Sequence, residues 1–147
     1  MEKGDGEEGS FLFWEETEQV IGALIEVHRR LGPGLLESVY EACVCRELVL
    51  CGMNVDRQRL VPLDYKGLKL DYGYRLDLVA NDRILLELKA VDALLPVHEA
   101  QVRTYLRLAN LPVGLLVNFN VVTLRTGLRR VTPTNPKTSP PPNLPLP

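Results

Sequence analysis

The chain has 147 residues, of which 46% are hydrophobic and 24% charged, and its net charge at pH 7 is −2. This length and composition suit one soluble globular domain with a real core, and hardly two. No apolar run approaches the roughly 20 residues that cross a bilayer. The polar start, MEKGDGEEGS, lacks the pattern of a secretory signal, so we expect a cytoplasmic protein.

The charges are unevenly distributed along the chain. Residues 1–18 contain seven acids and one base, which leaves 16 bases and 12 acids in the rest. From Val102 to the end there are six bases and no acid. This asymmetry is compatible with a modest face that attracts phosphates, although solubility alone often produces such clusters.

The first part of the chain predicts a disordered start followed by two helices. We expect residues 1–14 to be an acidic, disordered segment. Apolar residues at helical spacing predict a helix over residues 15–31, which the Gly32–Gly34 turn ends. A second helix is predicted from about residue 35 to 50. The apolar burst FLFW, residues 11–14, could pack on the chain's own core or could mediate homo-oligomerisation.

Beyond Gly52 the pattern changes to strands. Strands are predicted over residues 55–63, with Pro62 indicating an edge or an end, and over residues 68–72, after a turn. Two more strands are predicted over residues 74–79 and 84–89. A helix opened by Pro96 follows over residues 98–109, and a strand buried on both faces over residues 111–119 completes the domain. This order predicts an α/β fold in which a mixed sheet is flanked by helices, with the domain ending near residue 131.

Two further features of the composition are best explained without a special site. Seven of the eleven prolines lie from Thr132 onward, which predicts an extended, disordered tail over residues 132–147. That tail could bind a proline-reading domain or be an inert extension. Cys43, Cys45 and Cys51 lack a CxxC spacing, so plain thiols are expected rather than a zinc site.

The stretch RLDLVANDRILLELKAV, residues 75–91, places charged side chains inside two apolar strands. Because side chains alternate between the faces of a strand, each strand has one apolar face, and Asp77, Glu87 and Lys89 lie on the other. A three-residue turn of residues 81–83 would align the two apolar faces. The same register would set Asp77 beside Glu87.

Two neighbouring carboxylates repel each other, and burial increases the cost of their charges unless a cation joins them. A hard divalent ion such as Mg²⁺ would satisfy them. Lys89 could then stabilise a bound water or the negative charge that develops on a phosphate. The alternative is an ion-pair cluster of Asp77, Glu87, Lys89 and Arg75 on a solvated face of the sheet.

Two predicted helices add further polar residues to this group. Glu37 begins the second helix and shares a face with Tyr40, while His98, Gln101 and Tyr105 share one side of the third. Each has an ordinary explanation when taken singly. Glu37 suits a helix start, Gln101 a solvent-facing position, and Tyr105 a core position.

Together these residues resemble the PD-(D/E)xK nuclease superfamily over about residues 16–131. More closely, they resemble the bacterial GxxExxY proteins, whose motif is present as Gly34, Glu37 and Tyr40. Asp77 and the triplet Glu87-Leu88-Lys89 fit the acid and the ExK element of the nuclease signature. The HxxQ and QxxxY spacings are similar to those of the exonuclease domains of bacterial recombination helicase-nucleases. They are formed by His98, Gln101 and Tyr105.

The resemblance implies a restriction-endonuclease-like core and a metal-dependent nuclease, exonuclease-like, that hydrolyses phosphodiester bonds of nucleic acid, with DNA expected. Asp77, Glu87 and the backbone carbonyl of Leu88 would hold Mg²⁺ or Mn²⁺, and Glu37 would be an additional ligand of metal or water. Lys89 would orient the attacking water. Gln101 and Tyr105 would position the DNA strand or brace the site.

The sequence also departs from the family pattern, and a second interpretation stays open. Leu76 stands where the signature's proline would precede Asp77, and Thr104 replaces the Asn found before the Tyr in close relatives. The alternative is a catalytically inactive module that keeps the fold and binds nucleic acid or a protein partner. The small size and the absence of a basic stripe favour it, whereas the intact set of polar residues favours catalysis.

Overall fold

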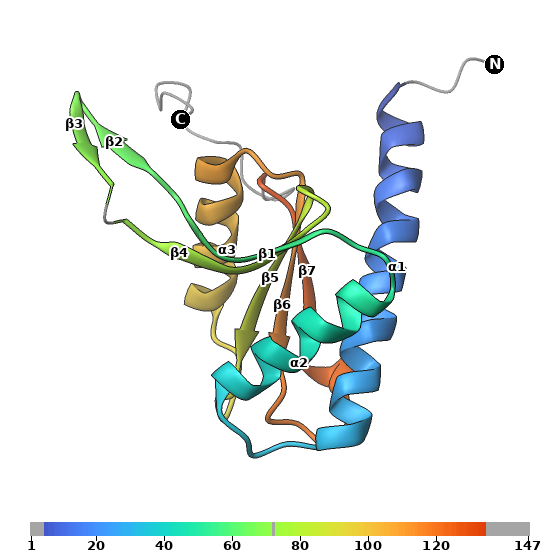
Figure 1. Ribbon diagram of the computed structural model, residues 1–147. Coiled ribbons are helices and arrows are strands. Elements are labelled where there is room, and N and C mark those ends of the chain that lie inside the picture. Colours follow the sequence, from blue (N-terminus) through green and yellow to red (C-terminus); the bar gives the residue numbers. More distant parts are fainter. Residues whose placement is uncertain (1–4, 72, 135–147) are drawn as a thin grey trace.

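The computed structural model describes the backbone of residues 5–71 and 73–134, with side chains from Trp14 onward. The domain has three layers: α1 and α2 cover one face of the central sheet, and α3 covers the other (Figure 1). The elements in chain order are α1 (Asp5–Leu31), α2 (Glu37–Leu50), β1 (Val55–Leu60), β2 (Leu63–Tyr65), β3 (Leu68–Leu70), β4 (Arg75–Ala80), β5 (Ile84–Lys89), α3 (Pro96–Ala109), β6 (Val113–Asn118), the 3₁₀ turn η1 (Leu124–Gly127) and β7 (Leu128–Val131).

The sheet is mixed, as predicted, with strand order β1-β4-β5-β6-β7. Strands β5 and β6 are parallel and are connected through α3, whereas the other neighbours are antiparallel. Strands β5 and β6 are buried on both faces, and this burial explains why β6 is apolar almost throughout. Strands β2 and β3 form a separate ribbon that projects from the sheet (Figure 1).

Helix α1 is anchored by an apolar stripe. Val20, Leu24 and Val27 are buried at helical spacing. His28 lies on the same side, and its Nε2 donates a hydrogen bond of 2.8 Å to the backbone carbonyl of Val121, in the segment between β6 and η1. These contacts fix the C-terminal half of α1 against the body of the domain, and the Gly32–Gly34 turn then directs the chain into α2.

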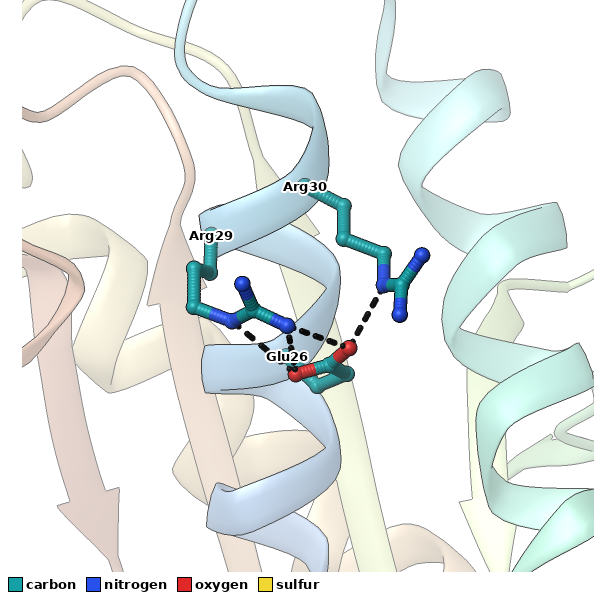
Figure 2. A network of polar contacts seen from close by, with 3 residues as sticks. All are labelled: Glu26, Arg29 and Arg30. Atoms are coloured by element: carbon teal, nitrogen blue, oxygen red, sulfur yellow. Dashed lines mark hydrogen bonds and ion pairs between the residues drawn. The ribbon is translucent and has the colours of Figure 1, made fainter.

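The last turns of α1 carry an exposed polar network, which Figure 2 shows. The carboxylate of Glu26 accepts hydrogen bonds from Arg29 at 3.0 Å and from Arg30 at 2.6 Å. The bond from Arg30 and then the bond from Arg29 lower the pKa of Glu26. Basic side chains are favourable at this end of a helix, so the network supports the end of α1.

Several predicted boundaries differ from the structure. Helix α1 begins at Asp5 rather than at residue 15, so the backbone of residues 5–14 is helical where we expected disorder. Extending an anchored helix needs no new nucleus, and residues 5–14 contain no proline. The edge strand β7 was missed because it is short and two of its four residues are exposed arginines. Strand β1 ends at Leu60, just before Pro62, as the proline indicated.

Some predictions concern residues that lie outside the described part of the chain. They include residues 135–147 of the proline-rich tail. They also include the side chains of residues 11–13, so the prediction that FLFW packs on the core or mediates homo-oligomerisation stays a prediction. In the described part, no helix is long and apolar enough to cross a membrane. Cys43, Cys45 and Cys51 are free thiols.

The predicted alternation of side chains holds in β5 but fails in β4. Leu78 joins the core under α1 and α2, with Leu86 and Leu88, as predicted. Leu76 instead joins the core under α3, so the even positions of β4 do not share one face. The second face is also not solvated, because Val79 and Leu85 are buried under α3. The change of face occurs at Asp77.

Candidate active site

Asp77 and Glu87 lie where the β4–β5 hairpin opens. A three-residue turn, residues 81–83, joins the strands, and the register pairs Leu78 with Leu86. One step further along this register, Asp77 lies opposite Glu87. There the backbone N–H of Leu88 donates to Asp77 Oδ2 at 3.0 Å, and the backbone N–H of Asp77 points to Glu87 Oε1 at 3.5 Å. Each carboxylate therefore accepts a backbone N–H from the opposite strand.

The surroundings make the charges on this pair costly. Glu87 is only 2% exposed. Burial, and then the neighbouring carboxylate of Asp77, raise the pKa of Glu87 to about 8. Burial is also the main cause that raises the pKa of Asp77, while the hydrogen bond from Leu88 opposes the rise. At neutral pH the pair therefore retains a proton unless a cation compensates its charge.

Lys89 is the last residue of β5 and is half-buried. Its positive charge lowers the pKa of both Asp77 and Glu87. Among the residues that the structure describes, neither Lys89 nor Arg75 forms an ion pair with these carboxylates. The Arg75 guanidinium instead donates to the backbone carbonyl of Gln58 at 3.4 Å. The structure thus does not contain the ion-pair cluster that we considered as an alternative.

The GxxExxY residues fasten the start of α2 to the end of β5. Gly34 has a φ of 95°, a left-handed conformation that favours glycine. Tyr40 is fully buried, stacks on Phe119 at 4.3 Å, and donates through its hydroxyl to the carbonyl of Gly32 at 2.6 Å. Glu37 accepts a hydrogen bond of 3.1 Å from the backbone N–H of Ala90. Tyr40 is therefore structural, and Glu37 lies directly beside the residue that follows Lys89.

A pocket of about 170 Å³ opens beside this group, and three carboxylates, a serine, a glutamine and a leucine line it: Glu37, Ser38, Glu41, Gln58, Asp77 and Leu88. We did not predict Glu41, which is 8% exposed and accepts hydrogen bonds from Arg57 and Gln58. The four-residue spacing between Glu37 and Glu41 on one helix was the available signal.

The donor set fits a hard divalent cation that keeps part of its water shell. Asp77 and Glu87 offer carboxylate oxygens, the ligands that Mg²⁺ prefers. Asp77 and Leu88 line the pocket, whereas Glu87 lies next to Asp77 and is not among the lining residues. Over the described ranges, no group of three or more His, Cys, Asp or Glu side chains is arranged to hold a metal. A closed protein cage is therefore not present there, whereas a site of two carboxylates completed by a carbonyl and water is compatible with the geometry.

The residues predicted on α3 separate into different environments. Tyr105 is buried and stacks on Tyr74 at 4.2 Å. Burial raises the pKa of both phenols, and the negative charge of Glu87 adds to the rise. Gln101 is exposed on α3, and His98 accepts the backbone N–H of Leu95 at 2.9 Å, so it caps the helix start. Tyr105 lies near the carboxylates, and Tyr74 joins it although we did not predict it.

Asn118, like Glu41 and Tyr74, was not predicted from the sequence. It is 2% exposed at the end of β6, in register with Lys89. Its side chain accepts the backbone N–H of Val91 at 3.1 Å and donates to the Val91 carbonyl at 2.9 Å. A lone Asn at the end of an apolar run was the only signal in the sequence. These bonds hold the turn that follows Lys89.

A family model of the PD-(D/E)XK nuclease superfamily matches residues 14–131, most of the chain. The chain belongs to this superfamily. The match supports a nuclease-type function and the predicted fold, and PD-(D/E)XK nucleases generally use divalent metal ions. It does not distinguish the GxxExxY proteins from other members. No curated protein and no solved structure matched this chain.

Proposed function

We propose that this PD-(D/E)XK protein is a metal-dependent nuclease that hydrolyses phosphodiester bonds of DNA in an exonuclease-like manner. The observation that carries the proposal is the Asp77–Glu87 pair at the opening of the β4–β5 hairpin. Both carboxylates are buried or half-buried, both have raised pKa values, and each accepts a backbone N–H across the hairpin. A divalent cation is the natural compensation for such a pair.

Asp77, Glu87 and the carbonyl of Leu88 would hold Mg²⁺ or Mn²⁺, and Glu37 would bind a water of the ion rather than the ion itself. When bound, the ion would lower the pKa of the nucleophilic water and neutralise charge on the phosphate. Lys89 would orient the attacking water and balance negative charge near the carboxylates. Its position in a rigid central strand supports this role, because catalytic geometry depends on fixed side chains.

The supporting residues would keep the reacting groups in place. Glu37 accepts a hydrogen bond from the N–H of Ala90, which links the start of α2 to the end of β5. Tyr105, stacked on Tyr74 near Glu87, would brace the carboxylate or contact the DNA strand. Gln101, exposed on α3, would contact the substrate. A nucleic-acid substrate is supported by the superfamily.

The test is cleavage of linear, circular and single-stranded DNA, and of matched RNA, with Mg²⁺ or Mn²⁺. Wild type is compared with Lys89→Ala and Asp77→Asn; the asparagine can still accept the N–H of Leu88, so the fold should be retained. Lys69→Ala, at an exposed lysine of the β2–β3 ribbon, and Asp92→Asn, at an exposed aspartate after β5, are the matched controls.

We expect metal-dependent cleavage that requires a DNA end, and a loss of at least about a hundredfold in both site variants, as is typical when a group acting in proton transfer or charge stabilisation is removed. The two controls should cleave like wild type. Equal residual activity in wild type and site variants would indicate contamination. If wild type binds DNA without cleaving it, the inactive binding module becomes the better interpretation.

A further inference from the structure

Gln58 has an unusual backbone conformation at a significant place in the sheet. Its φ is 54°, in the left-handed region that residues other than glycine rarely adopt. It lies within the edge strand β1, not in a turn. In the register of β1 with β4, Arg57 pairs with Leu78 and Arg59 with Leu76, so Gln58 lies opposite Asp77. The strain therefore occurs beside the candidate metal ligand, and the surroundings must offset it.

The left-handed backbone brings two adjacent side chains to one side of β1. In a regular strand, Arg57 and Gln58 would point to opposite faces. Here Arg57 Nη2 donates to Glu41 Oε2 at 3.0 Å, and Gln58 Nε2 donates to Glu41 Oε1 at 2.5 Å. Both oxygens of this buried carboxylate are occupied. The Arg75 guanidinium also holds the carbonyl of Gln58. The conformation of Gln58 is thus held from both its side chain and its backbone.

Strand β4 has a matching irregularity at the same pair. Leu76 packs under α3 and Leu78 packs under α1 and α2, so the alternation of β4 shifts at Asp77. The carboxylate of Asp77 lines the pocket together with Gln58 and Glu41, and it accepts the N–H of Leu88. Two paired strands therefore change faces at facing residues, and the change directs Asp77 into the pocket.

We infer that Gln58 and Glu41 are positioning residues for Asp77: their hydrogen bond holds β1 in the left-handed conformation that keeps the Asp77 carboxylate in the pocket, where it accepts the N–H of Leu88. The inference rests on the proposed function for its consequence, metal binding, but not for its geometry. Without the Gln58–Glu41 bond, β1 would relax toward a regular strand. The Asp77 carboxylate would then leave the pocket and lose its bond with the N–H of Leu88.

The experiment compares Gln58→Ala, Glu41→Ala and the double variant with wild type. Asn81→Ala is the matched control. Asn81 lies beyond the other end of β4 and also has a left-handed φ, 53°. Its side chain likewise makes a hydrogen bond, because it accepts the backbone N–H of Asn54 at 3.0 Å. Amide exchange of Leu88 is measured by NMR in the metal-free protein. The Kd for Mn²⁺ alone is measured by calorimetry.

Gln58→Ala and Glu41→Ala should each lower the exchange protection of Leu88 by about tenfold or more, the loss expected for one hydrogen bond to a charged group. Each should raise the Kd for Mn²⁺ by about 10- to 100-fold, as for residues that orient metal ligands. The double variant should add little, because both changes remove the same bond. Asn81→Ala should change neither quantity.

The inference is overturned if Gln58→Ala and Glu41→Ala both show the same Leu88 exchange protection and the same Kd for Mn²⁺ as Asn81→Ala. If Gln58→Ala does not fold, Glu41→Ala decides the question alone through the Leu88 amide. Wild-type protein that neither binds Mn²⁺ nor cleaves DNA would refute the proposed function. Loss of Leu88 protection in the variants would still support the positioning of Asp77 in that case, so the two failures are distinguishable.

Discussion

Replacing Glu87 with glutamine should stabilise the metal-free protein, and the gain should increase with pH. In the unfolded chain a glutamate loses its proton near its ordinary pKa of 4.5, whereas in the folded protein Glu87 keeps it up to a pKa of about 8. Between these values the folded state binds a proton that the unfolded state has lost. The free energy of unfolding of wild type therefore falls as pH rises through this window, and glutamine removes that loss.

The magnitude follows from the difference between the two pKa values. Each pKa unit corresponds to about 1.4 kcal/mol, so ionising Glu87 costs at most about 5 kcal/mol above pH 8 and about 3 kcal/mol at pH 7. These are upper values, because the chain and water relax around a buried charge. Below pH 4 the contribution disappears. The side chain of the Glu87→Gln variant would keep an oxygen that accepts the N–H of Asp77, so no hydrogen bond needs to be lost.

The assay is urea unfolding with a chelator present, at several pH values between 4 and 9. Glu18→Gln, at an exposed glutamate on α1, is the matched control and should differ from wild type by the same small amount at every pH. A difference between Glu87→Gln and wild type that stays flat across this range would refute the argument that Glu87 is buried beside a like charge. Excess Mg²⁺ should reverse the order, because it stabilises only the protein that binds it.

Two further predictions concern the framework of the site. Tyr40→Phe keeps the stack on Phe119 but loses the hydrogen bonds of the hydroxyl to the turn over residues 32–35. It should lower the free energy of unfolding by about 1–2 kcal/mol in urea titrations. An unchanged free energy of unfolding would refute a structural role of the hydroxyl. Gly127→Ala places a Cβ in steric conflict with the carbonyl oxygen of Asn118, so we expect about 1–3 kcal/mol of destabilisation. Gly22→Ala, with no atom within 4 Å on exposed α1, is its control and should instead stabilise by about 1 kcal/mol; equal effects would contradict the packing at Gly127.

The register of the site could be predicted because it follows from the period of the strands. Aligning two apolar faces across a three-residue turn leaves one arrangement, and the structure confirms the turn at residues 81–83. The two central strands and α3 were likewise identified from apolar pattern and from Pro96. Local physics was sufficient wherever a buried face repeats regularly.

The residues that surround Asp77 could not be predicted in the same way. Gln58 lies among charged residues in an edge strand, so its side chain would be expected to face solvent. Its left-handed backbone could not be predicted either, because the residue is neither glycine nor asparagine, the types that usually adopt a positive φ. That conformation depends on Glu41, which is 17 residues away in the sequence. The face change of β4 occurs at Asp77, directly opposite Gln58. A period-two pattern assumes regular strands, so it fails at the point where irregularity builds the site.

The most direct test of the central claim is the anomalous difference density of crystals soaked in Mn²⁺. We expect a peak within coordination distance of carboxylate oxygens of both Asp77 and Glu87, next to the carbonyl of Leu88, and no such peak in Asp77→Asn crystals. A peak elsewhere, or none at Mn²⁺ concentrations that support cleavage, would contradict the central claim.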